Sequence, residues 1–266
     1  PDKPADPIIV HPDVRRMLLT QKAFAEGARA LAFYCGQLAD IVRLKHGSDD
    51  AKRAETMMEL LTPICKGFMT DTGYESANHG MQVLGGHGYI REHGMEQLVR
   101  DCRILQQYEG ANGIQALDLL GRKVLANGGA TLRIFTDQID AFCQQHAAQP
   151  ELKEFVDALA PLTKEWHGLV GDILQRAIKN PDEAGAASYD FMTYSGYVTY
   201  AFLFARMAAV ALPKSKAGAD ADFYRAKVQT ARFFFQRLLP RTRGLIPSML
   251  SGAANVMELE DAHFAF

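Results

Sequence analysis

The sequence predicts an all-α fold made of two helical bundles packed together. Apolar residues recur at intervals of three and four along almost every long segment, which is the period that places them on one face of a helix. No segment shows a convincing strand pattern. Short polar, glycine- and proline-containing stretches separate the periodic segments and mark the turns between helices.

Two long helices are expected first. One of about 30 residues lies within 12–47, where a proline and an aspartate favour the start and a glycine favours the end. After a polar turn at 48–50, an apolar stripe predicts a second helix over 57–84, which Pro63 should kink. The glycine-rich sequence at 85–88 should end this helix, because consecutive glycines supply positive φ and leave no side chain to pack.

Shorter elements follow. We expect a helical piece around 95–102, an irregular connection at 103–109 and a further helix. The sequence Asn127-Gly128-Gly129 then marks the boundary between a domain at 1–127 and a domain at 128–266. In the second domain the apolar stripes predict helices over 132–142, 152–173, 191–212 and 224–238, the last of them ending at Pro240.

The segment 191–212 is long and apolar enough to cross a membrane. However, Arg206 lies inside it among tyrosines, threonines and a serine, and a charge there would cost about 2.5 to 3.5 kcal/mol on insertion scales. We therefore expect the buried central helix of a soluble bundle and no membrane span.

Charge and cysteine content exclude several classes of function. The net charge of -2, from 29 Lys and Arg against 31 Asp and Glu, provides no basic field for nucleic acid. The four cysteines contain no C-x-x-C pair, which predicts reduced thiols in a cytoplasmic protein and neither disulfides nor zinc. The spacing of His79, His87 and His93 fits no common ligand pattern, so no metal site is expected.

Two segments could carry chemistry. The bare glycines within Gln82–Tyr89 would let a backbone approach a phosphate or cofactor, although they also fit a helix C-cap and a tight turn. No strand precedes them, so they are not a dinucleotide-binding fingerprint. Tyr108-Glu109-Gly110 places a carboxylate between an aromatic ring and a glycine. Glu109 is either a solvated surface charge or a desolvated base that accepts a proton.

Both segments belong to one longer pattern. It comprises Gln82-x-x-Gly85-Gly86-x-Gly88-Tyr89, Arg100-Asp101-x-x-Ile104, Tyr108-Glu109-Gly110 and Ile114-Gln115. In order, spacing and residue type, this pattern resembles the last third of acyl-CoA dehydrogenases. The resemblance covers roughly residues 12 to 125 and implies a four-helix bundle there, while 128–266 resemble the extra helical domain of the family's larger members.

The resemblance implies a flavin-dependent oxidation of an acyl-CoA thioester to the trans-2-enoyl-CoA. Glu109 matches the family's base, which removes the α proton while a hydride passes from the β carbon to FAD. Tyr108 and Gly110 would line the acyl pocket beside it. The resemblance also implies an electron-transfer flavoprotein as the partner that reoxidises the flavin.

The same matching implies a homodimer that shares its flavin sites. The FAD of a neighbouring subunit would contact Gln82, Val83, Leu84, Gly85 and Gly86. Ala111 and Gly113 stand where many members have Thr or Ser and a flavin-bonding Gln, so only backbone contacts with the flavin are expected there. We interpret this change as a trait of the subgroup with the extra domain. The arginine that usually meets the flavin pyrophosphate has no clear counterpart.

The family's middle β-domain has no counterpart in this sequence, which begins with Pro1. We therefore expect a fragment that is inactive alone and binds FAD weakly or not at all. Two alternatives remain open, namely an acyl-CoA oxidase, which shares the fold but reduces oxygen, and a non-catalytic helical dimerisation module. The intact Glu109 argues against the module, because a scaffold would have no reason to keep a carboxylate beside a hydrophobic pocket.

Overall fold

The computed structural model describes residues 4–265, and within this range every regular element is a helix, which confirms the all-α expectation. The α-helices are α1 (Pro12–Leu44), α2 (Asp49–Val83), α3 (Gly86–Tyr89), α4 (Met95–Ile104), α5 (Asn112–Leu117), α6 (Ala130–His146), α7 (Lys153–Ala177), α8 (Asp182–Lys214), α9 (Ala221–Phe233), α10 (Thr242–Met249) and α11 (Ala254–Met257). Short 3-10 turns are Ile8–Val10, Arg91–His93, Leu125–Asn127, Pro150–Leu152, Leu239–Arg241 and Asp261–Ala265. Two π-helical stretches occupy Asp118–Val124 and Phe234–Leu238.

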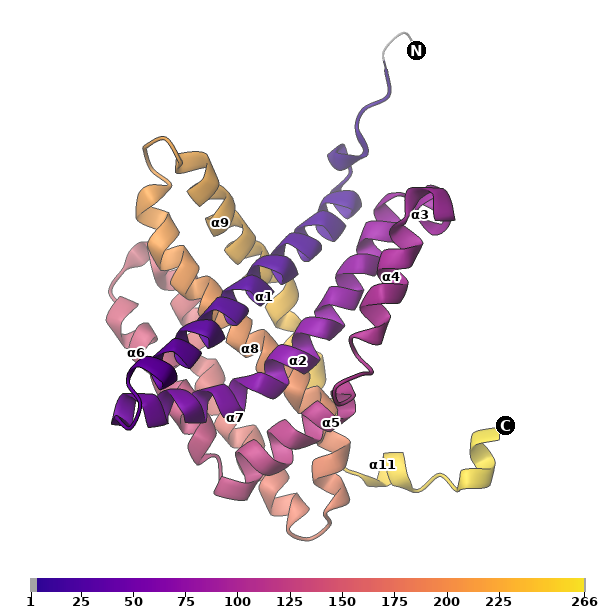
Figure 1. Cartoon of the computed structure of the whole chain (residues 1–266), viewed down its shortest axis with the longest axis vertical. Helices are drawn as coiled ribbons and strands as arrows, with labels where there is room; N and C mark the ends of the chain where they lie inside the picture. Colours follow the sequence, from indigo (N-terminus) through magenta and orange to yellow (C-terminus); the bar gives the residue numbers. More distant parts are fainter. Residues whose placement is uncertain (1–3, 266) are drawn as a thin grey trace.

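The long helices α1 and α2 form an antiparallel hairpin that crosses the front of the molecule in Figure 1. The second helix begins at Asp49, earlier than its apolar stripe predicted. Ser48 caps it, because the Ser48 hydroxyl accepts the Ala51 N–H at 3.1 Å, and Asp49 and Asp50 place negative charge in the first turn, where the helix dipole favours it. Local capping therefore extends α2 beyond the buried face.

The predicted end of the last long helix at Pro240 is wrong. After α9 the chain passes through Phe234–Leu238 into the 3-10 turn Leu239–Arg241 and then into α10. Pro240 lies in the first turn of this 3-10 segment, where a missing N–H leaves no helical hydrogen bond unmade. Helical structure therefore continues to Met249, with changes of helix type at these short segments.

Helix α8 is the centre of the fold. By length and composition it is a candidate to cross a membrane, and 72% of its most apolar window is buried inside the molecule. It packs against helices from both halves of the chain, namely α1, α2, α5, α7, α9 and α10. Arg206 reaches the surface, where its guanidinium lies over the rings of Tyr34 and Phe202 at 5.4 and 5.5 Å. These contacts support the interpretation of α8 as a core helix.

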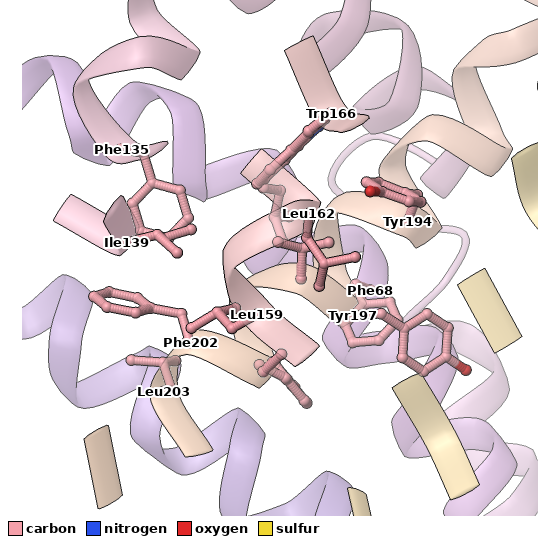
Figure 2. Packing of buried hydrophobic residues seen from close by; sticks show 14 of the residues in the cluster. Phe68, Phe135, Ile139, Leu159, Leu162, Trp166, Tyr194, Tyr197, Phe202 and Leu203 are labelled. Atoms are coloured by element: carbon pink, nitrogen blue, oxygen red, sulfur yellow. The ribbon is translucent and has the colours of Figure 1, made fainter. Parts of the chain in front are cut away.

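Aromatic side chains fill the space around α8. Figure 2 shows Trp166 between Phe135 and Tyr194, with Phe68 and Tyr197 at the other end of the same cluster. The ring of Phe135 meets that of Trp166 edge-on at 6.3 Å, and the ring of Phe68 meets that of Tyr197 at 4.9 Å. The cluster joins α2, α6, α7 and α8, so one hydrophobic core runs through both halves of the chain. The domain division at residue 127 remains a prediction.

Three glycines allow α8 to approach α1 and α2 closely. A Cβ atom at Gly27 would overlap the Tyr200 ring, one at Gly67 would overlap the Met192 side chain, and one at Gly196 would overlap the Phe68 ring. Each of these glycines lies inside a helix, where glycine costs about 1 kcal/mol relative to alanine. The close contact between the helices explains why glycine stands at these positions despite that cost.

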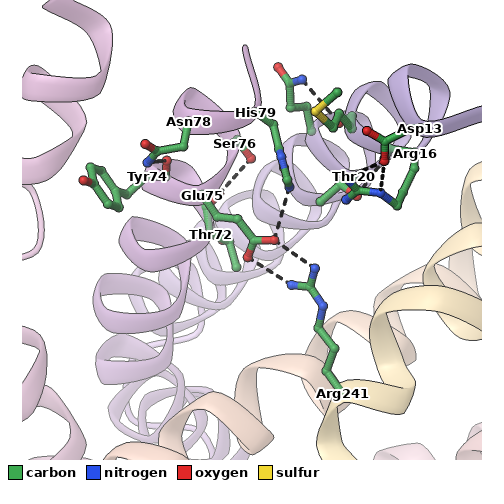
Figure 3. A network of polar contacts seen from close by, with 12 residues as sticks. Asp13, Arg16, Thr20, Thr72, Tyr74, Glu75, Ser76, Asn78, His79 and Arg241 are labelled. Carbon is green, nitrogen blue, oxygen red and sulfur yellow. Dashed lines mark hydrogen bonds and ion pairs between the residues drawn. The ribbon is translucent and has the colours of Figure 1, made fainter. Parts of the chain in front are cut away.

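An ion pair adds a polar link between the two halves. Arg241, beyond the π-helical stretch that follows α9, donates through both terminal nitrogens to the Glu75 carboxylate of α2 at 2.9 and 3.0 Å (Figure 3). The same guanidinium donates to the Tyr197 hydroxyl at 3.1 Å. Two parallel bonds from one guanidinium fix its orientation as well as its distance, so this pair sets how α2 and the C-terminal segment meet.

Candidate active-site loop and glycine turn

The segment 105–111 connects α4 to α5 and carries Glu109. Among the described residues Glu109 is the single non-glycine residue with positive φ, at 53°, and Gly110 follows with φ 86°. The left-handed conformation costs an L-residue about 1 to 2 kcal/mol, and such strain clusters at functional sites. The loop therefore holds the predicted base in a backbone conformation that the surrounding structure must enforce.

Asn112, the first residue of α5, anchors one end of this loop. Its side chain is 4% exposed, and its amide Nδ2 donates to Asp71 Oδ1 at 2.7 Å and to the Gly67 carbonyl at 3.1 Å. Its Oδ1 accepts the Lys66 ammonium at 2.8 Å. A buried amide with these partners on α2 fixes the position of the α5 start, because leaving any of them unpaired would cost free energy.

Gln106 anchors the other end of the loop. Its Nε2 donates to Asp71 Oδ1 at 2.6 Å, and its carbonyl accepts the Asn112 backbone N–H at 3.1 Å. The second carboxylate oxygen of Asp71 accepts the Tyr189 hydroxyl of α8 at 2.6 Å. Asp71 on α2 is therefore hydrogen-bonded to both ends of the loop and to a residue from the second half of the chain.

Gln115 supports the strained part of the loop from within α5. Its Nε2 donates to the Glu109 carbonyl at 3.3 Å and lies 3.5 Å from the Gly110 carbonyl. A Cβ atom at Gly110 would lie 2.7 Å from this nitrogen, which is too close, and φ at Gly110 is also positive. The positive φ favours glycine at position 110, and a larger residue would also displace the end of the Gln115 side chain.

The loop presents its predicted site residues to solvent. Tyr108 is 47% exposed, and Glu109, Gly110, Ala111 and Gly113 are exposed as well. An open depression of about 440 Å³ lies beside them and is lined by Tyr74, Arg103, Gln106, Gln107, Ala111, Asn112, Gly113 and Tyr189. This chain gives Glu109 no apolar surround of its own, so any desolvation of the carboxylate must come from groups outside the chain.

The second predicted segment is the turn after α2. Gly85 has φ 59° and is the N-cap of the short helix α3, and a Cβ atom at Gly85 or Gly86 would meet nothing within 4 Å. Gly88 differs, because a Cβ atom there would overlap the Met81 carbonyl. Leu84 beside the turn is 44% exposed. The Gly85–Gly86 backbone is therefore exposed at the surface, while Gly88 has a structural role.

The structure does not bring these two segments together within one chain. The turn lies before the N-terminal end of α4 and the Glu109 loop lies after its C-terminal end, so α4 separates them (Figure 1). A ten-residue helix is about 15 Å long. Residues Gln82–Gly86 and the Glu109 loop therefore lie at opposite ends of α4.

The histidines near the turn make contacts of other kinds. The rings of His87 and His93 meet edge-on at 5.4 Å. His79 Nε2 lies 3.5 Å from the Glu75 carboxylate, and Figure 3 draws this contact. Within residues 4–265 no three His, Cys, Asp or Glu side chains gather in a metal-binding arrangement.

Sequence reasoning did not identify Asp71, Asn112 or Tyr189. Asn112 had a usable signal, because an asparagine directly after the Glu-Gly-Ala stretch stands at the start of a helix, where its side chain often bonds nearby backbone. Asp71 and Tyr189 had none, since they are 118 residues apart and meet only through helix packing.

The fold and the loop define the class of the protein: an all-α module whose surface carries a strained carboxylate and, at the far end of α4, an open glycine turn. Two family models match it, "Acyl-CoA dehydrogenase, C-terminal domain" over residues 3–125 and "Acetyl-CoA dehydrogenase C-terminal like" over residues 135–260. The chain belongs to the acyl-CoA dehydrogenase family. The matched ranges contain both predicted segments.

Curated relatives match nearly the whole chain. The 3-methylmercaptopropionyl-CoA dehydrogenase of Ruegeria pomeroyi is 40% identical over 88% of this chain and 40% of its own length. The broad-specificity linear acyl-CoA dehydrogenase FadE5 of Mycobacterium tuberculosis is 34% identical over 99% of this chain and 45% of its own length. The chain thus spans less than half the length of these relatives.

Solved structures share the fold. Acyl-CoA oxidase3 from Yarrowia lipolytica superposes with a TM-score of 0.67 at 16% identity, covering 97% of this chain and 40% of that protein. ACDH-11 of Caenorhabditis elegans, solved in complex with C11-CoA, gives a TM-score of 0.58 at 17% identity, covering 81% of this chain and 34% of that protein. At such identities the similarity establishes the helical architecture alone.

Proposed function

We propose that this chain is the C-terminal part of a flavin-dependent acyl-CoA dehydrogenase in which Glu109 is the catalytic base. The observation that carries the proposal is the conformation of Glu109, a carboxylate held at φ 53° on a loop whose two ends are tied to one aspartate. A surface glutamate with no function would not justify the cost of that strain. Membership of the family supports the same role.

The chemistry follows from the thioester. Its carbonyl acidifies the α C–H bond, and the Glu109 carboxylate takes the α proton. Bound FAD would supply the acceptor for the β hydrogen, which leaves as hydride and produces the trans-2-enoyl thioester. Tyr108 and Gly110 beside the base would contact the acyl chain, and Gly110 would let the substrate approach closely because it has no side chain. Domains outside this chain would exclude water from the carboxylate.

The positions of the flavin-facing residues support a shared site in a dimer. Ala111 and Gly113 would meet the flavin beside Glu109 through backbone atoms, while the Gln82–Gly86 segment would meet the flavin of the neighbouring subunit. Each flavin would therefore need two chains and the domains that precede them. We expect this chain alone to bind FAD weakly or not at all and to be inactive.

We propose electron-transfer flavoprotein as the electron acceptor for the reduced flavin. We also propose a cytoplasmic location, which the four free cysteines support because thiols stay reduced there. The alternative is an oxidase that reduces oxygen, because the fold of this chain is also similar to that of acyl-CoA oxidase3. The two are distinguished by the rate at which air reoxidises the flavin after one anaerobic turnover with substrate. Slow reoxidation supports the dehydrogenase and rapid reoxidation supports the oxidase.

The decisive experiment uses the natural gene product that contains this chain, purified with its flavin. Anaerobic mixing with a panel of thioesters should bleach the flavin with at least one of them. The panel takes its classes from the relatives: 3-methylmercaptopropionyl-CoA, linear acyl-CoAs and butyryl-CoA. Glu109→Gln should abolish the bleaching, while Glu55→Gln, at an exposed glutamate of α2, should leave it unchanged. Normal bleaching by Glu109→Gln would contradict the proposal.

A further inference from the structure

The second half of the chain reaches the candidate active-site loop through Tyr189 of α8. Its hydroxyl donates to Asp71 Oδ2 at 2.6 Å, and its side chain lines the same depression as Ala111 and Gly113. Burial and the hydrogen bond to Asp71 raise the pKa of Tyr189 above its usual range, so the phenol keeps its proton and remains a donor at physiological pH. Tyr189 therefore bonds the carboxylate that holds the loop.

The geometry at Asp71 gives this bond a consequence for the loop. Oδ1 of Asp71 accepts Gln106 at 2.6 Å and Asn112 at 2.7 Å, and these residues flank Glu109 on either side. The Tyr189 hydroxyl occupies the other oxygen and thereby fixes the rotation of the carboxylate. Hydrogen bonds to an ionised acceptor are short and strong, so the orientation set at Oδ2 is transmitted to both bonds at Oδ1.

Packing of α8 on α2 keeps Tyr189 in place. Met192, three residues further along α8, fills the space above Gly67, and the Gly67 carbonyl accepts the Asn112 amide at 3.1 Å. Residues three apart on a helix lie on the same face. The same face of α8 thus supports the loop twice, once through the bond from Tyr189 to Asp71 and once through the contact of Met192 with Gly67.

We propose that Tyr189 is a positioning residue for Glu109: its hydroxyl orients the Asp71 carboxylate, which holds both ends of the loop that carries the base. This inference rests on the proposed function. It assigns to the C-terminal half of the chain a part in the reaction, because the Tyr189 hydroxyl helps to fix the position of the Glu109 carboxylate.

The test is Tyr189→Phe in the flavin-containing gene product. Tyr189 is 43% exposed, so loss of one hydroxyl leaves its packing intact. Anaerobic stopped-flow reduction by a thioester that bleaches the parent should show a limiting rate about tenfold lower, because a displaced base lowers the rate of proton transfer. Substrate Kd and flavin content should stay unchanged, and the isotope effect with α-deuterated thioester should increase.

Tyr34→Phe is the matched control. Tyr34 also donates one hydroxyl bond to a side chain, Gln138 Oε1 at 2.7 Å, but it lies on α1, away from the loop. This variant should reduce its flavin at the parent rate. A purely structural role for Tyr189 would instead lower flavin content or thermal stability while leaving the rate per bound flavin and the isotope effect unchanged, and that result would overturn the proposal.

A double-mutant cycle with Asp71→Asn tests the route through Asp71. If Tyr189 acts through that carboxylate, Tyr189→Phe should have little further effect on the reduction rate in the Asp71→Asn background, whereas fully multiplied effects would contradict the route. Glu109→Gln in the same series separates this inference from the proposed function. Parent-like reduction by Glu109→Gln refutes the function itself. Loss of reduction by Glu109→Gln together with parent-like Tyr189→Phe refutes the positioning role alone.

Discussion

The hydrogen bond from Asn112 Nδ2 to Asp71 Oδ1, 2.7 Å long, ties the first residue of α5 to the middle of α2 and so defines one end of the loop that carries Glu109. Asn112 is buried, and the bond is one of several that its amide makes to α2. The loop that carries Glu109 is thus positioned by α2, which contributes neither Glu109 nor the predicted site residues next to Glu109 in the sequence.

Asn112→Ala should destabilise this chain by about 2 to 3 kcal/mol, because it removes the acceptor of the Lys66 ammonium and the amide that bonds Asp71 and the Gly67 carbonyl. Urea unfolding followed by circular dichroism measures the change. Asn78→Ala, at an exposed asparagine that bonds only its own helix backbone, is the control and should shift stability by less than about 0.5 kcal/mol. Equal stability of the two variants would show that the Asn112 contacts contribute little.

A shared flavin site predicts complementation between two inactive subunits of the gene product. One subunit carries Glu109→Gln, and the other carries Gly86→Glu, which adds a charged side chain to the open turn without a steric clash. Each homodimer should fail to oxidise substrate. The purified hybrid should recover about half the parent activity, because one of its two sites then combines an intact Glu109 with an intact turn. An inactive hybrid would mean that both segments serve the same site within one subunit.

The helical elements were predictable because their signals are local. The proline at the start of α1, the glycines after α2 and the continuous apolar stretch of α8 are each signals within one short segment of sequence, and the structure confirms all three. Pro240 misled because proline ends a helix interior but is tolerated in the first turn of a new one. Which residues begin the next turn depends on packing that the local sequence does not encode.

The candidate site was predictable only where residue type itself carries the chemistry. Glu109 and the glycines around it could be identified from their order and spacing. The left-handed conformation of Glu109 was not expected, because a glutamate has no intrinsic preference for positive φ and adopts it only when Gln115 and Asp71 hold the loop. Tyr189 was missed for a related reason, since only the tertiary fold brings α8 to α2.

Gly196→Ala should destabilise the chain by about 2 to 3 kcal/mol through overpacking. The new methyl group would overlap the Phe68 ring, which cannot withdraw because the rings of Tyr197 and Tyr200 lie 4.9 and 5.0 Å away. Gly185→Ala on the same helix is the control. Its Cβ would meet nothing within 4 Å, so the better helix propensity of alanine should add about 0.5 to 1 kcal/mol. Equal urea midpoints for the two variants would contradict the close approach of α8 to α2.

His167 predicts a measurable pH dependence of stability. Burial, helped by the nearby Arg133, lowers the pKa of His167, although Asp140 and Asp137 act in the opposite direction. The unfolded chain therefore binds a proton below about pH 6.5 that the folded chain resists, so this histidine reduces stability as the pH falls. His167→Gln keeps an amide beside Thr136 and cannot titrate. Its stability should fall less than that of the parent between about pH 7.5 and about pH 5 in urea unfolding. Parallel pH profiles would contradict this role.

Cys35 and Cys65 predict an internal disulfide under oxidising conditions. Their sulfur atoms lie 3.5 Å apart across the α1–α2 hairpin, a proximity that their separation in the sequence does not reveal. The hydrogen bond with Cys65 lowers the pKa of Cys35, and burial opposes it, so Cys35 is the better nucleophile of the pair. Diamide, which takes up two electrons and the two thiol protons, should join them.

The measurement is a thiol count in denaturant before and after diamide treatment. Four thiols should fall to two, since burial raises the pKa values of both Cys102 and Cys143, and the cysteine-to-cysteine contact among the described residues joins Cys35 and Cys65. The protein should stay monomeric on a non-reducing gel, because the bond forms within one chain. Cys65→Ser removes the partner, and its three remaining thiols should survive the same treatment. If the parent keeps all four thiols, or loses them only through dimers, the two sulfur atoms are not close enough in solution to react with one another.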